Sequence, residues 1–102
     1  MLASFSIVPI GVGEELKGFV AQLMPILEKS GLDFKLGAMQ TTLEGDERSV
    51  MDVIMACHRR MKEVAPRVLT SITIDDRTGA SGRLEGKVRD VETELKREIL
   101  HE

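Results

Sequence analysis

The fold is decided by one continuous stretch, residues 45–74, with the sequence GDERSVMDVIMACHRRMKEVAPRVLTSITI. Its first part repeats apolar residues at the spacing of an amphipathic helix, and Asp46 is placed to cap the start of that helix. The apolar positions are Val50, Val53, Ile54, Cys57, Met61 and Val64. We expect the helix to end at Ala65-Pro66, because the residue before a proline is pushed out of the helical conformation.

The remainder of this stretch, residues 67–74, alternates in the manner of a strand and is rich in β-branched side chains. One face of the strand is predicted to point into the core, and it carries Val68, Thr70, Ile72 and Ile74. Residues 2–10 alternate in a similar way and predict another strand, with Phe5 and Ile7 on its buried side. Pro9 lacks a backbone donor, so this strand should lose its pairing on one side there.

A second helix is predicted over residues 16–27, after the turn Gly11-Val-Gly13. Pro25 should kink or shorten this helix, and Ser30-Gly31 is a signal for its end. Two short alternating runs, residues 32–36 and 38–44, follow on either side of a glycine and predict a hairpin. Near the end of the chain, a third helical stripe consists of Leu84, Val88, Val91, Leu95 and Ile99.

The predicted order is therefore βαββαβ with an additional C-terminal helix. This order is typical of the ferredoxin-like sandwich, an α+β fold in which two helices cover one face of a four-stranded sheet. Because 102 residues suit a single hydrophobic core, we expect residues 1–102 to form one domain.

Composition narrows the function classes. The chain is 42% hydrophobic and 30% charged, which is ordinary for a globular domain and does not suggest a membrane protein. Its longest uncharged stretch, residues 1–13, is too short to cross a bilayer and lacks the features of a secretory signal. Cys57 is the only cysteine, so we expect a cytoplasmic protein in which this thiol is buried. The net charge of −3 argues against a nucleic-acid partner.

Catalytic and metal-binding chemistry has little support. Asp75-Asp76 could hold a metal, but paired acids at a strand end more often meet cations or water, so no metal site is predicted. His58 and His101 lack ligand partners at helical spacing and are expected to be solvated. No nucleophile and base can be paired, so we predict no catalytic residue and no enzyme activity.

The uncovered face of the sheet is the distinctive surface. Its expected residues are small, rich in hydroxyls and nearly uncharged: Ser4, Ser6, Val8, Gln40, Thr42, Glu44, Leu69, Ser71 and Thr73. RNA-recognition domains share the βαββαβ order but stack bases on aromatic side chains of this face, and none is expected here. The composition favours close approach by another protein surface, and we expect homo-oligomerisation sheet to sheet.

Four fragments in order resemble the thiamine-binding protein family: Ile7-Val-Pro-Ile-Gly11, Met39-Gln-Thr-Thr-Leu-Glu-Gly45, Ile72-Thr-Ile-Asp-Asp-Arg77 and Lys87-Val88. The resemblance implies a ferredoxin-like protomer, assembled as a homotetramer, that binds thiamine or its hydroxymethylpyrimidine moiety without transforming it. Thiamine would be a ligand rather than a cofactor, and no cofactor is expected. Family members often have Pro-Met-Gly-Thr where this chain has Ala38-Met-Gln-Thr41, which changes the pocket at Gln40.

The resemblance also suggests ligand-binding residues. Met39 would form a soft wall, and Glu44 would offset the thiazolium charge. Thr41, Ser6 and Ser71 would hydrogen-bond the pyrimidine. The same residues could instead belong to the core or to a subunit interface. An alternative function is a regulatory or scaffold oligomer that senses another small metabolite or a protein partner.

Overall fold

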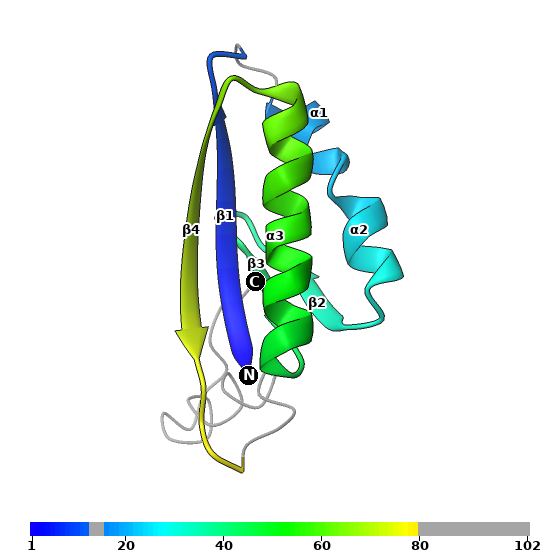
Figure 1. Ribbon diagram of the computed structural model, residues 1–102, viewed down its shortest axis with the longest axis vertical. Coiled ribbons are helices and arrows are strands. Elements are labelled where there is room, and N and C mark those ends of the chain that lie inside the picture. Colours follow the sequence, from blue (N-terminus) through cyan, green and yellow to red (C-terminus); the bar gives the residue numbers. More distant parts are fainter. Residues whose placement is uncertain (13–15, 80–102) are drawn as a thin grey trace, which may run out of the picture.

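The computed structural model describes residues 1–12 and 16–79. Four antiparallel strands form one sheet: β1 (Leu2–Ile10), β2 (Asp33–Leu36), β3 (Thr41–Glu44) and β4 (Arg67–Asp75). Their order is β2-β3-β1-β4, and the helices α1 (Leu16–Ala21), α2 (Met24–Lys29) and α3 (Glu47–Val64) connect them as in the ferredoxin-like sandwich (Figure 1). The predicted fold class is confirmed, while the expected C-terminal helix lies outside the described residues.

The long helix α3 has the predicted ends and the predicted apolar face. The backbone N–H of Ser49 donates to Asp46 Oδ2 at 3.0 Å, and this bond caps the first turn. Val50, Ile54, Cys57 and Met61 are buried along one stripe of the helix. Ala65 is already extended before Pro66, as the proline requires.

The first helical segment is divided by proline, as the sequence indicated. Pro25 stands in the first turn of α2, where its missing N–H would have no partner inside the helix. A continuous helix would place the proline ring against the carbonyl of Ala21, so α1 ends there and α2 begins three residues later. Ser30 closes α2 by donating its hydroxyl to the carbonyl of Leu27 at 2.6 Å. Gly31 follows with φ of 74°, a conformation that favours glycine.

The strand β1 lies in the middle of the sheet but has two neighbours over only half its length. It pairs with β3 from Leu2 to Phe5 and with β4 along all nine of its residues. From Ser6 onward β1 and β4 therefore continue as a two-stranded ribbon. Pro9 lies in this part, where the sheet provides a single neighbour for β1, which agrees with the predicted loss of pairing.

The hydrophobic core lies between one face of the sheet and the helices. Its members come from every layer: Ala3, Phe5, Leu23, Leu27, Leu43, Val50, Ile54, Cys57 and Met61. Figure 1 shows α3 running beside β1, with α1 and α2 on the side of α3 away from β4. Among the described residues, the helices thus cover one face of the sheet and leave the opposite face open.

Candidate functional site

The open face of the β1–β4 ribbon is lined by cross-strand pairs. Because side chains alternate along a strand, the residues beside buried Ala3 and Phe5 point away from the helices. The register pairs Ser4 with Thr73, Ser6 with Ser71 and Val8 with Leu69. We call these six residues the open face. Two rows of hydroxyls therefore lie next to one apolar row, and no charged side chain is among them.

The apolar row is well exposed. Val8 is 44% exposed and Leu69 is 48% exposed. Exposure of such large apolar side chains is unfavourable, because their burial away from water stabilises a folded protein. Ser71 is also exposed, and Ser6 is half-buried. The open face thus combines apolar side chains with a few hydroxyls. Such a surface can bind a flat small molecule with polar edges, or a closely fitting protein surface.

Four of the five predicted ligand residues lie on strands, and they divide between the two faces of the sheet. Ser6 and Ser71 are direct cross-strand partners on the open face. Thr41 pairs with buried Phe5, so its side chain lies on the helix-facing side of the sheet. Glu44 pairs with Leu2 and shares the outward side with Ser6, but it lies at the far end of β3, about 10 Å along the strand from Thr41.

Met39 does not lie on a strand, which corrects the expected run over residues 38–44. The N–H of Gly37 donates to the carbonyl of Gln40 at 2.9 Å, and this bond closes a turn that contains Ala38 and Met39. Met39 is consequently 81% exposed. Gln40 likewise belongs to the turn and not to the open face. The turn stands at the end of β3 where β1 continues with Ser6.

A polar contact on the helix-facing side was missed by the sequence reasoning. His58 is half-buried rather than solvated, and its Nδ1 lies 2.6 Å from Thr70 Oγ1. The signal was available, because His58 follows Ile54 by four positions and precedes Met61 by three, so it adjoins the apolar stripe of α3. Cys57 is fully buried as predicted, and burial raises the pKa of its thiol to about 11.

Within residues 1–12 and 16–79, no three histidine, cysteine or acidic side chains gather in a way that could hold a metal ion. Asp75 ends β4 opposite Leu2, while Asp76 and Arg77 are exposed beyond it. None of the helices in this part of the chain is long and apolar enough to cross a membrane.

Comparisons with known proteins cover almost the whole chain. The family model described as thiamine-binding protein matches residues 3–92. The UPF0045 protein Mb1933 of Mycobacterium bovis is 36% identical over 98 residues, which cover 95% of this chain and 96% of that protein.

Solved structures share the fold. The hypothetical protein MJ1052 of Methanocaldococcus jannaschii superposes with a TM-score of 0.81 at 28% identity, covering 88% of this chain and 93% of that one. A candidate thiamine biosynthesis or salvage protein of Thermotoga maritima shares the fold with a TM-score of 0.77 at 23% identity, covering 88% of this chain and 96% of its own. Because the family model matches residues 3–92, most of the sequence, the chain belongs to the thiamine-binding protein family.

Proposed function

We propose that this protein binds thiamine or its hydroxymethylpyrimidine moiety as a homo-oligomer, with a tetramer as the expected assembly, and does not transform the ligand. The observation that carries the proposal is the family match over residues 3–92. The open face supports it, because its rows of hydroxyls and apolar side chains suit an aminopyrimidine ring, which has acceptor nitrogens, an amine donor and flat apolar faces.

The proposed contacts follow the placement of the side chains. Ser6 and Ser71 are neighbours on one face and are the proposed hydrogen-bonding pair for the pyrimidine. Met39, exposed on the adjoining turn, is the proposed apolar wall. Glu44 is the proposed counter-charge for the thiazolium. Thr41, predicted to bond the pyrimidine, lies on the helix-facing side and is left out of the proposed contacts.

Calorimetric titration tests ligand binding. Thiamine and hydroxymethylpyrimidine should each produce a saturable heat, and thiamine should be recovered intact after prolonged incubation. Ser6→Ala and Ser71→Ala should each weaken binding about tenfold, the effect of losing about 1.4 kcal/mol. Thr78→Val is the matched control, because Thr78 is an exposed hydroxyl beyond the end of β4. No heat with millimolar thiamine would refute the proposed ligand.

Light scattering tests the assembly separately. If copies meet through the open face, Leu69→Asp should lower the oligomer mass, because it buries a charge against an apolar surface. Val20→Asp is the control, since Val20 on α1 is exposed to a similar degree, 41% against 48% for Leu69. A monomer at all micromolar concentrations of the unmodified chain would overturn the oligomeric part of the proposal.

A further inference from the structure

The helix-facing side of β4 is only partly covered. Val68 and Thr70 are half-buried beneath the helices, as core-facing residues should be. Ile72 and Ile74 belong to the same side of the strand, yet they are 36% and 50% exposed. The reason is the position of the helices, because α1 and α2 lie beyond α3 and leave α3 alone next to β4 (Figure 1).

The contact between His58 and Thr70 shows which residues of α3 lie level with the two isoleucines. The chain reverses at Ala65-Pro66, so β4 runs back along α3. One helical turn rises about 5.4 Å, and two residues of a strand rise about 6.6 Å. Each turn of α3 therefore advances about as far as two residues of β4. Starting from His58 opposite Thr70, Met55 therefore lies level with Ile72, and Met51 with Ile74.

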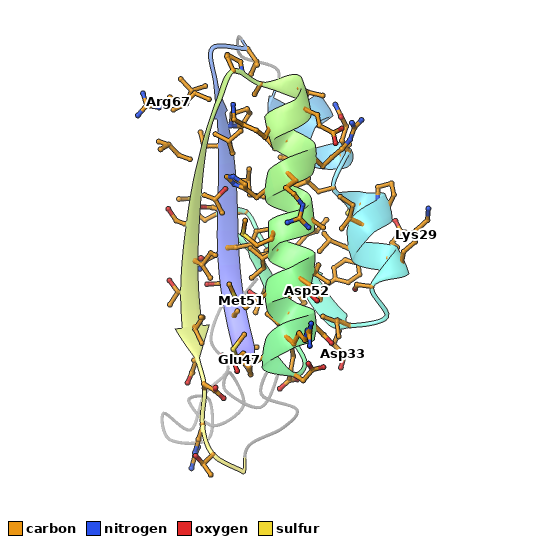
Figure 2. All side chains as sticks on the ribbon, viewed as in Figure 1. Lys29, Asp33, Glu47, Met51, Asp52 and Arg67 are labelled. Carbon is orange, nitrogen blue, oxygen red and sulfur yellow. The ribbon has the colours of Figure 1, made fainter. Side chains whose placement is uncertain are left out.

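Both methionines add apolar surface to this side of the protein. Met55 is 38% exposed and Met51 is half-buried. Figure 2 shows Met51 on the side of α3 that faces β1 and β4. We call the four residues Met51, Met55, Ile72 and Ile74 the α3–β4 flank. It is more apolar than the open face, which carries hydroxyls in two of its three rows.

The remaining chain is of suitable length and pattern to cover this flank. Residues 80–102 follow Gly79, at the end of the molecule where Ile74 and Met51 lie. A helix over residues 84–99, as the sequence stripe predicts, would be about 24 Å long at about 1.5 Å per residue. The nine residues of β4 span about 30 Å. Such a helix could run back along β4 and bring its apolar stripe over the flank.

We propose that the α3–β4 flank is the docking site for residues 84–99 of the same chain. The short connection from Gly79 to Leu84 holds this segment near the flank at high effective concentration, which favours its own chain over a second copy. Docking on this side leaves the open face available to a ligand or to another protomer. The inference does not depend on thiamine being the ligand.

Disulfide trapping tests the docking in the full-length protein. Ile72→Cys combined with Val88→Cys places one thiol on the flank and one on the stripe, within the range of Cα separations that a disulfide needs if the segment docks as proposed. Ser71→Cys combined with Val88→Cys is the matched control, because Ser71 is the residue before Ile72 in the same strand and points to the open face. Cys57 can remain, since it is fully buried.

The Ile72 pair should form an intramolecular disulfide at least tenfold faster than the Ser71 pair. The proposal would be overturned if the Ser71 pair formed its intramolecular bond faster than the Ile72 pair. It would also be overturned if folded Ile72-pair protein formed no disulfide, or formed mainly a covalent dimer. A second measurement needs no new cysteine: Val91→Asp should speed peroxide oxidation of Met55 several-fold, whereas Thr93→Asp should not. Thiamine titration of the Ile72 pair reports on the proposed function separately, because Ile72 faces away from the proposed ligand residues Ser6 and Ser71.

Discussion

Replacing Ile54 with alanine tests whether α3 holds the core together. Ile54 is fully buried on the stripe that also contains Val50, Cys57 and Met61. The change removes three carbon atoms, a loss of about 2.4 kcal/mol at about 0.8 kcal/mol for each buried methylene. A residual cavity adds to this, so the free energy of unfolding should fall by about 3–4 kcal/mol. For a domain of this size, such a loss is a large fraction of the total stability.

Urea unfolding followed by far-UV circular dichroism measures the change. The midpoint should fall while the slope with urea stays constant, and the protein concentration must be fixed because assembly would also stabilise the fold. Asp52→Ala, two positions earlier on an exposed site of the same helix, should alter the free energy by less than about 0.5 kcal/mol. A loss below about 1 kcal/mol for Ile54→Ala, with an unchanged slope, would contradict the packing described for α3.

Two further predictions concern ionisable groups of α3. The hydrogen bonds from Ser49 to the Asp46 side chain lower the pKa of that carboxyl in the folded protein. The charged carboxylate therefore stabilises the fold at pH values above 3.8, the pKa in the unfolded chain. This contribution is lost as the pH falls through the lower pKa of the folded protein. Asp46→Ala should therefore lower the melting temperature at pH 7. Thermal melts across pH should show the difference in melting temperature between the variant and the unmodified protein shrinking below about pH 4. A difference that stays constant with pH would argue against the cap. The Cys57 thiol, buried with a pKa of about 11, should react with a thiol reagent at pH 8 far more slowly in folded protein than in urea, and equal rates would contradict its burial.

Local signals in the sequence predicted the elements well. The limits of α3 depend on Asp46 and Pro66, which act on their immediate neighbours, and both ends were correct. Pro25 divided the first helical segment for the same kind of reason. The turn at Met39 was missed, because an alternating run of residues does not show where a hairpin begins its reversal.

The candidate site was harder to predict than the fold. Ser6 and Ser71 are 65 positions apart in the chain, and only the register between β1 and β4 makes them neighbours. Thr41 and Ser6 were both predicted to contact the pyrimidine, yet strand pairing puts them on opposite sides of the sheet. The contact of His58 with Thr70 likewise depends on how α3 packs on β4. Such relations depend on long-range pairing and packing rather than on local propensity.

The strand β4 carries both proposed surfaces, and this makes its register important for function. Leu69, Ser71 and Thr73 face outward, while Thr70, Ile72 and Ile74 face the helices, so a slip of one residue would exchange the two sets. Two features specify the observed register: pairing with β1 along nine residues, and the contact between Thr70 and His58. That contact would be lost if Thr70 turned outward. The half-buried histidine therefore helps to keep hydroxyls on the proposed ligand side and isoleucines on the proposed docking side.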